Sequence, residues 1–420
     1  MINTTGPMEW VSAISTRPSL EAAVTEVVKK CQESLKSSPD LGLVFISSAF
    51  SSDYPRLMPL LAEQLSVRVL IGCTGGGIVG MQTETQVKEI EGKPALGLCL
   101  AHLPGVDICP FHLTTNDLPD LDNPPEDWVE LIGVHPQNDP QFIVLIDPFY
   151  GKINDLLQGL DYAYPESPKV GGLASSGMMG RATAVFCKGE MYSAEAVGVA
   201  LTGNIVLETI VAQGCRPIGE PYRVSEGERN IILTVQKCSE TDGLNINCGD
   251  EVAPLEALQE LIAELGEEDR QLAQNSLFVG VARDEFKANL ESGDFLIRNL
   301  MGVDPRVGAM AIGDRVRPGQ RIQFHLRDSR TSAEDLKGLL TRHQKLTEAT
   351  TEVAKEGALM FSCLGRGENL YGQPDFDSNL FREYFKIPLT GFFCNGEIGP
   401  VGNATFLHGY TCVFGILRQR

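Results

Sequence analysis

The feature of this sequence that most constrains its fold is a recurring order of segments: an apolar run, a helical pattern, a second apolar run and a glycine-rich turn. Short runs rich in β-branched and aromatic residues predict buried strands. Val44 and Gly72 have the same separation in the sequence as Val144 and Gly172. The copies span residues 43–77, 142–177 and 358–399. The recurrence predicts similar strand–helix–strand units, each ending in a glycine turn.

These units predict an α/β fold: a layered two-domain protein with mixed β-sheets flanked by helices. A chain of 420 residues exceeds the usual size of one core. The acidic segment 239–274 has a helical pattern and is our predicted boundary between domains at residues 10–238 and 275–420. Residues 20–36 predict an amphipathic helix, because their apolar side chains recur at helical spacing.

Two further strands are predicted between the first two units. Residues 95–103 and 106–113 are both rich in strand-forming residues. Pro104-Gly105 lies between them and is typical of a tight turn. We therefore expect an antiparallel hairpin.

Charge and cysteine usage limit the classes of partner. The formal net charge is −20, which disfavours nucleic acids and anionic lipid surfaces and leaves small molecules or proteins. The 11 cysteines include no Cys-x-x-Cys pair, which favours free thiols in a reducing cytoplasm. Residues 1–17 lack the apolar core of a signal peptide, and no apolar stretch is long enough to span a membrane.

Several common motifs are excluded. Residues 75–80 match G-x-G-x-x-G, but the acidic residue that a dinucleotide site needs on the next strand is missing. The pairs Gly92-Lys93 and Gly151-Lys152 lack the Ser or Thr of a phosphate loop. Leu173 replaces the first glycine of a nucleophile elbow around Ser175. We expect no cofactor.

Two Cys-x-x-His pairs resemble a zinc quartet: Cys99 with His102, and Cys109 with His112. On a strand, however, residues i and i+3 point to opposite faces. Each pair would therefore be divided between the faces of its sheet. We expect no metal site.

The most unusual polar cluster lies near the C-terminus. Cys363 and Arg366 follow one apolar run, Glu397 follows another, and His408 comes later. Cys363 with His408 could form a nucleophile. The alternative is a buried thiol with a structural ion pair between Arg366 and Glu397. These two charged residues could also clamp a ligand that carries amino and carboxylate groups.

Five ordered segments resemble the FIST family and together cover roughly residues 10–417. The turn at residues 72–78 and the segment 170–175 are similar to signatures of the FIST N-terminal domain. Residues 298–305, 361–367 and 391–400 are similar to signatures of the FIST C-terminal domain. The resemblance implies intracellular sensing of small ligands such as amino acids, beside signalling output domains in bacteria or F-box segments in eukaryotes. No such output segment is recognisable in the sequence, so we expect signalling through a separate protein.

The resulting hypothesis is a cytoplasmic sensor or adaptor that binds a small polar ligand at glycine-rich strand ends, where a backbone without side chains allows close approach. The rival hypotheses are an enzyme with a reactive cysteine, Cys363 or Cys73, for acyl-transfer or redox chemistry, and a non-catalytic scaffold. The residues that we expect to contact the ligand are Gly72, Cys73, Thr74, Gly171, Gly172, Ser175, Arg366, Gly396 and Glu397.

Overall fold

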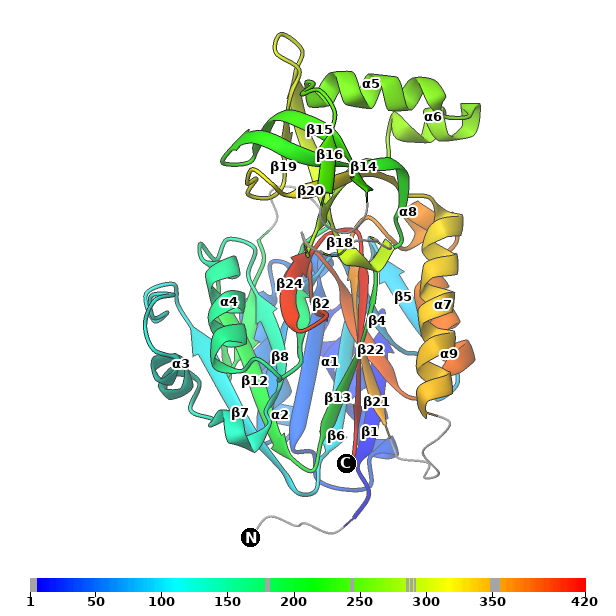
Figure 1. Cartoon of the computed structure of the whole chain (residues 1–420). Helices are drawn as coiled ribbons and strands as arrows, with labels where there is room; N and C mark the ends of the chain where they lie inside the picture. Colours follow the sequence, from blue (N-terminus) through cyan, green and yellow to red (C-terminus); the bar gives the residue numbers. More distant parts are fainter. Residues whose placement is uncertain are drawn as a thin grey trace. The chain divides into compact units, whose positions relative to one another are not determined.

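A computed structural model describes residues 6–177, 182–241, 245–284, 287, 290, 292–347 and 356–420. The chain forms two compact units. One contains Met1–Ala212 together with Lys337–Arg420, and the other contains Gln213–Leu336. The mixed sheets and flanking helices confirm the predicted fold class (Figure 1).

The larger unit is built from three copies of one order of strands. The first copy contains β1 (Glu9–Ser15), α1 (Leu20–Ser34), β2 (Leu41–Ser47), α2 (Tyr54–Gln64), β3 (Val69–Gly75), β4 (Gly77–Met81), β5 (Val87–Glu91) and β6 (Leu96–His102). The second contains β7 (Val106–Leu113), α3 (Pro125–Ile132), β8 (Gln141–Ile146), α4 (Ile153–Ala163), β9 (Lys169–Leu173), β10 (Val185–Cys187), β11 (Glu190–Tyr192) and β12 (Ala196–Gly203). The third contains β13 (Val206–Ala212), α7 (Ser329–Thr347), β21 (Gly357–Cys363), α8 (Glu368–Tyr371), α9 (Phe376–Tyr384), β22 (Leu389–Cys394), β23 (Glu397–Val401), β24 (Ala404–His408) and β25 (Cys412–Arg418).

The copies exchange strands in a cycle. The three sheets have the orders β1-β6-β2-β3-β10-β11, β7-β12-β8-β9-β23-β24 and β13-β25-β21-β22-β4-β5. Each sheet has one parallel pair, β2–β3, β8–β9 or β21–β22, as a strand–helix–strand unit requires. After each glycine turn, the chain enters the sheet of another copy. The glycine turns are therefore the places where the three copies meet.

Each sheet buries one face in a shared core and covers the other with helices. Phe45, Ile143 and Phe361 come from the three sheets and belong to the same apolar cluster. Helices α3 and α4 lie side by side against the strands of the second sheet (Figure 1). The predicted helix at residues 20–36 is confirmed as α1, whose first turn is capped by the Ser19 hydroxyl accepting from the N–H of Ala22.

A close approach of backbones fixes the parallel pairs. Gly72 lies opposite Val44, and a Cβ on it would come within 2.0 Å of the Val44 carbonyl oxygen. In the second copy the residue opposite Val144 is Gly171, not Gly172, so the equal spacing seen in the sequence is off by one residue. A Cβ on Gly171 would lie 1.7 Å from the Val144 oxygen. These glycines are needed because no side chain fits between the strands.

The predicted hairpin of residues 95–103 and 106–113 is wrong. Both strands form, as β6 and β7, but they belong to different sheets. β6 already has a partner on each side, β1 and β2, so neither of its edges is open to β7. The turn at Pro104-Gly105 instead carries the chain from the first copy to the second.

The smaller unit contains one seven-stranded sheet with the order β14-β20-β17-β18-β19-β15-β16. Its elements are β14 (Arg216–Glu228), β15 (Ile231–Thr241), β16 (Asn245–Cys248), α5 (Pro254–Glu264), α6 (Glu267–Ala273), β17 (Leu277–Ala282), β18 (Phe295–Asp304), β19 (Ala309–Ile312) and β20 (Arg321–Leu326). The apolar sides of α5 and α6 pack in its core. In the chain this unit interrupts the third copy, from the end of β13 to Leu336 within α7. The domain ranges 10–238, 239–274 and 275–420 remain a prediction.

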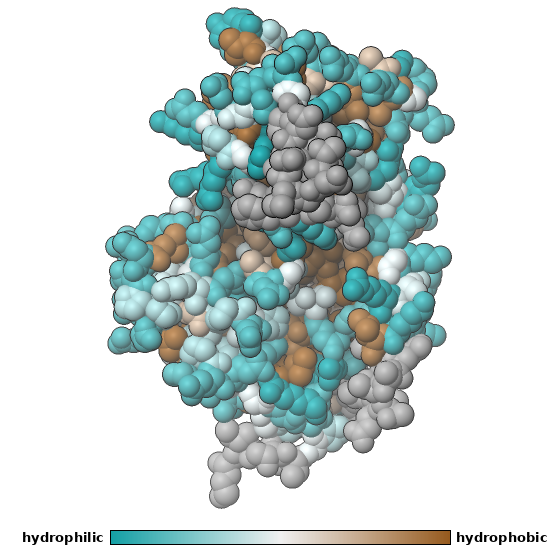
Figure 2. Space-filling model, in the orientation of Figure 1, coloured by the Kyte–Doolittle hydropathy of each residue, from teal (hydrophilic) through white to brown (hydrophobic). Residues whose placement is uncertain are grey.

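Hydrophilic side chains cover most of the face seen in Figure 2. Within the described residues, no helix is long and apolar enough to cross a membrane.

Candidate functional site

The three glycine turns are joined by a ring of hydrogen bonds. The N–H of Ser175 donates to the Thr74 carbonyl oxygen at 3.0 Å, and the N–H of Asn395 donates to the Leu173 oxygen at 3.1 Å. By the same pattern, the N–H of Gly76 should donate to the Phe393 oxygen. The buried Ser175 hydroxyl lies between them instead: it accepts from the Gly76 N–H at 2.8 Å and donates to the Phe393 oxygen.

Pairing of β9 with β23 brings together four of the predicted site residues. Glu397 lies opposite Gly172, and Gly171 lies opposite Ile398 in the same ladder. The carbonyl oxygen of Gly396 accepts from the N–H of Leu173 at 2.8 Å. These contacts serve the junction between the second and third copies. Gly72, Cys73 and Thr74 lie in β3, at the junction with β10.

Arg366 is fully buried and has a carboxylate partner other than Glu397. Its Nε and Nη2 donate to the two carboxylate oxygens of Asp377, at 2.7 and 3.0 Å. Nη2 also donates to the Tyr371 hydroxyl at 2.6 Å. Burial disfavours the charged guanidinium, but Asp377 outweighs it and holds the pKa of Arg366 above its ordinary value. The guanidinium is thus neutralised by a bidentate pair with Asp377, which lies in the first turn of α9.

Glu397 is buried beside this pair, and its environment favours the protonated form. Burial raises the pKa of Glu397 to about 8, although the Thr411 hydroxyl and N–H donate to Oε2 and oppose the shift. The Arg366 charge also lowers it, so the two predicted clamp residues are neighbours without a direct ion pair.

The predicted cysteine nucleophiles differ in access. Burial raises the pKa of the Cys73 thiol well above its ordinary value, which disfavours a thiolate there. Cys363 is half-buried at the end of β21. His408 is buried, and its Nε2 lies 3.0 Å from the Gly399 carbonyl oxygen. A carbonyl only accepts, so this contact assigns the proton to Nε2.

A polar cavity of about 390 Å³ lies beside the ring of turns, and we call it the glycine-turn cavity. Gly76 contributes from the first turn, and Ser176 and Gly177 contribute from the second. The other lining residues are Ser47, Ser48, Ala49, Glu91, Gly92, Lys93 and Leu364. Backbone amides, hydroxyls, one carboxylate and one ammonium group thus surround a space of the size that small ligands occupy.

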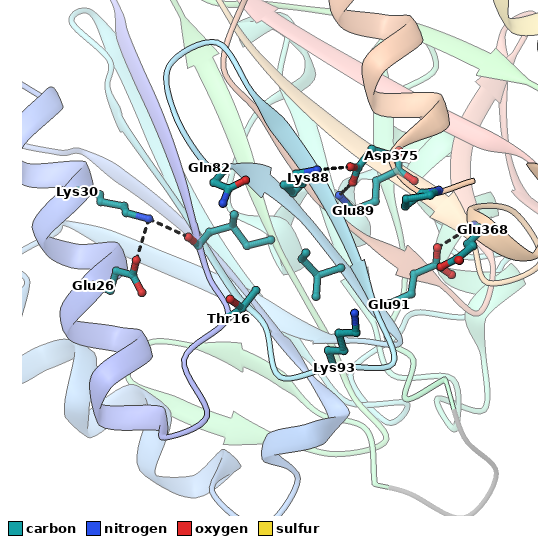
Figure 3. A pocket seen from close by; sticks show the side chains of 13 residues that line it. Thr16, Glu26, Lys30, Gln82, Lys88, Glu89, Glu91, Lys93, Glu368 and Asp375 are labelled. Atoms are coloured by element: carbon teal, nitrogen blue, oxygen red, sulfur yellow. Dashed lines mark hydrogen bonds and ion pairs between the residues drawn. The ribbon is translucent and has the colours of Figure 1, made fainter. Parts of the chain in front are cut away.

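A second cavity of about 530 Å³, the edge cavity, lies along β5 (Figure 3). It is lined by Ile14, Thr16, Glu26, Lys30, Gln82, Lys88, Glu89, Ile90, Glu91, Lys93, Glu368, Pro374 and Asp375. Lys30 pairs with Glu26 at 2.9 Å, and Lys88 pairs with Asp375 at 2.6 Å. For Lys93 there is no ion pair with any residue that the structure describes. It is the lining cation best placed to accept a ligand.

Glu91 and Lys93 line both cavities and join them into one polar region. Burial raises the pKa of Glu91, while a hydrogen bond from the Glu368 N–H to Oε1 at 2.9 Å opposes the shift. The neighbouring Glu89 is buried, and its pKa is raised to about 8 by burial and by the Asp377 charge. The region therefore combines an exposed cation with a buried and a half-buried carboxyl group, both with a raised pKa.

Sequence reasoning missed the residues that line these cavities. None of the nine predicted contact residues is among the lining residues of either cavity. The first two predicted glycine turns do reach the glycine-turn cavity, since its lining residues Gly76, Ser176 and Gly177 lie one or two residues beyond predicted positions. Lys93 belongs to the Gly92-Lys93 pair, which drew attention in the sequence. The sequence alone showed only that this pair is not part of a phosphate loop.

Comparison with known proteins gives two domain matches. A model described as FIST N domain matches residues 40–237, and one described as FIST C domain matches residues 254–400. The uncharacterized protein Rv0628c of Mycobacterium tuberculosis is 31% identical, over 95% of this chain and 96% of that protein. The F-box/LRR-repeat protein At5g63520 of Arabidopsis thaliana is 21% identical, over 97% of this chain and 85% of that protein.

Among solved structures, a cyanuric acid hydrolase from A. caulinodans aligns with 98% of this chain and 99% of its own. The TM-score is 0.32 and the identity is 7%. These values are too low to support a conclusion about fold or activity.

Proposed function

Since the chain belongs to the FIST family, with a FIST N and a FIST C domain, we propose that it binds a small polar ligand in the glycine-turn cavity and signals through a separate partner protein. FIST domains are sensory domains of signal transduction. Amino acids and similar polar metabolites are the proposed ligand class. The observation that carries the proposal is a cavity of ligand size where turns from different copies meet.

The chemistry of the lining supports a ligand with charges of both signs. The Lys93 ammonium provides a cation for a carboxylate, and the Glu91 carboxyl provides an acceptor for an amino group. The hydroxyls of Ser47 and Ser176 add donors and acceptors at other points of the wall. Few, well-placed polar groups of this kind give a cavity its specificity.

The position of the cavity supports a sensor. A ligand there touches residues of more than one copy, and it lies next to the ring that Ser175 closes. Binding would then change the free-energy difference between two arrangements of the junction. A partner protein that binds one arrangement more tightly would detect this change. Among the predicted contact residues, Thr74, Ser175, Arg366 and Glu397 would act by holding this framework.

Thermal-shift screening of amino acids and polar metabolites, followed by calorimetry, tests the proposal. We expect at least one compound to raise the melting temperature, because a ligand that binds only the folded state stabilises it. Lys93→Gln should lower the binding affinity for that compound at least tenfold. Lys29 is an exposed lysine on α1, and Lys29→Gln should leave the affinity unchanged. A screen in which no compound stabilises the wild type would contradict the proposal.

A further inference from the structure

The edge cavity follows the free edge of a strand. Four consecutive residues of β5, from Lys88 to Glu91, line it. Successive side chains of a strand point to opposite faces, so a cavity on one face would touch only alternate residues. β5 is also the last strand of its sheet, with β4 as its neighbour. The cavity therefore has access to the backbone of β5.

A carboxylate of the protein already occupies part of this edge. Asp375 Oδ1 accepts from the backbone N–H of Glu89 at 2.6 Å, and Oδ2 accepts from the Lys88 ammonium at 2.6 Å (Figure 3). The N–H of Glu89 thus points outward, away from β4. An outward N–H beside a lysine is the arrangement with which this edge binds a carboxylate.

A second pair of donors, the backbone N–H of Glu91 and the ammonium group of Lys93, follows further along the chain. The alternation of a strand directs the backbone groups of Glu91 outward, like those of Glu89. Lys93 follows, and its ammonium group lies at the lining of the cavity (Figure 3). Asp375 holds the first donor pair, and the second pair faces the cavity without a carboxylate from the described part of the chain.

We propose that the edge cavity binds a short peptide with free termini, which lies along β5 with its carboxylate at Lys93 and its amino group toward Asp375. The inference rests on the proposed function, because the edge cavity shares Glu91 and Lys93 with the glycine-turn cavity, and it extends the ligand class to short peptides. An extended peptide can add to an open strand edge by backbone hydrogen bonds. In the parallel direction, a ligand N–H meets the Glu89 oxygen and a ligand carbonyl meets the Glu91 N–H.

The charges at the two ends favour this direction. Lys93 attracts the C-terminal carboxylate. At the other end, the carboxylate of Asp375 has acceptor capacity beyond its two present hydrogen bonds, because a carboxylate offers about four lone-pair sites. An ammonium group can use this capacity, whereas the reverse direction would place the peptide ammonium beside that of Lys93.

The length of the edge limits the peptide to two or three residues. From Glu89 to Lys93 an extended chain spans at most about 13 Å. A tripeptide in the same conformation spans about 10 Å, and a single amino acid cannot reach both ends. The volume of about 530 Å³ is in keeping with a ligand larger than one amino acid.

Calorimetry with the full-length protein tests the peptide against the single amino acid. The probes are an equimolar mixture of free amino acids, a random tripeptide library, and the same library with amidated C-termini. We expect the tripeptides to bind at least tenfold more tightly than the amino acids. Amidation of the C-termini should remove this difference in affinity. Lys93→Gln should reduce tripeptide affinity at least tenfold and make it insensitive to amidation, while Lys29→Gln should match the wild type.

The outcomes separate this inference from the proposed function. Amino acids binding as tightly as tripeptides, or amidated tripeptides binding as tightly as free ones, would overturn the peptide inference and leave the sensor proposal standing. A non-peptide metabolite that binds in a Lys93-dependent manner, with no response to tripeptides, would have the same consequence. Absence of stabilisation by peptides, amino acids and metabolites alike would overturn both.

Discussion

The side-chain hydroxyl of Ser175 donates to the backbone oxygen of Phe393, although 218 positions separate the two residues in the chain. It also accepts from the N–H of Gly76, so one hydroxyl connects all three copies of the larger unit. At the equivalent positions of the other two junctions, backbone groups bond directly, Ser175 to Thr74 and Asn395 to Leu173. At the junction beside the glycine-turn cavity, the Ser175 hydroxyl therefore stands between the Gly76 N–H and the Phe393 oxygen, where the other junctions have a direct backbone hydrogen bond.

Ser175→Ala should lower the free energy of unfolding by about 1–3 kcal/mol, because it leaves a buried N–H and a buried carbonyl without their partner. Urea unfolding followed by circular dichroism measures the loss. Ser52→Ala is the matched control, since Ser52 is exposed and its hydroxyl donates to the neighbouring Asp53 carboxylate. The control should stay within about 0.5 kcal/mol of the wild type. Equal effects of the two variants would contradict the bridging role.

Asp377→Asn should destabilise the protein by about 3–5 kcal/mol, since it leaves the buried guanidinium of Arg366 without a countercharge. Asp304→Asn is a matched control: Asp304 binds Arg306 through the same two-pronged contact, but Arg306 is 85% exposed. An exposed pair contributes little to stability, because water screens the two charges. Unfolding by urea should separate the two variants clearly, and similar losses would refute the argument from burial.

Gly72→Ala and Gly338→Ala should change stability in opposite directions. A methyl group on Gly72 would overlap the Val44 carbonyl oxygen in a rigid parallel pair, so we expect a loss of about 1–3 kcal/mol or more. Gly338 lies in α7, is exposed and has open space around it. Alanine is favoured over glycine in a helix by about 0.5–1 kcal/mol. Melting temperatures of both variants test the signs, and a gain in Gly72→Ala would disprove the close approach.

The repeated units were predictable because their signals are local. A strand, a helix and a glycine turn each leave a pattern within about 15 residues, and α1 and the parallel pairs formed where the patterns placed them. The exchange of β4, β10 and β23 was not predictable. These strands are short, and their partners lie in other copies, so no local spacing specifies the pairing.

The candidate site was only partly predictable for the same reason. The sequence directed attention to the glycine turns, and the turns do meet. It could not place Lys93 and Gly177 in the lining of one cavity, or pair Lys88 with Asp375, because both follow from the strand exchange. Nor could it distinguish Glu397 from Asp377 as the partner of Arg366. Both carboxylates follow Arg366 in the sequence, and the sequence does not show which of them points toward it.

The buried carboxyl of Glu397 should make stability fall as the pH rises. Its pKa is raised from 4.5 to about 8 by burial, so between these values the native state binds more protons than the unfolded state. The contribution of this group is therefore complete below about pH 4.5 and is lost as the pH approaches 8. Glu397→Gln keeps the shape of the protonated form and removes the titration. We expect it to match the wild type near pH 5 and to exceed it near pH 8, by up to about 4 kcal/mol.

Urea unfolding at intervals from pH 5 to pH 8.5 measures the difference in unfolding free energy between Glu397→Gln and the wild type. The other titrating groups are the same in both proteins, so their contributions cancel. Glu33→Gln serves as the control, because Glu33 is exposed on α1, and its curve should run parallel to that of the wild type. The Thr411 hydroxyl and N–H stabilise the ionised form of Glu397, so Thr411→Val should steepen the loss toward pH 8. A Glu397→Gln curve that stays parallel to the wild type would mean that Glu397 titrates alike in both states.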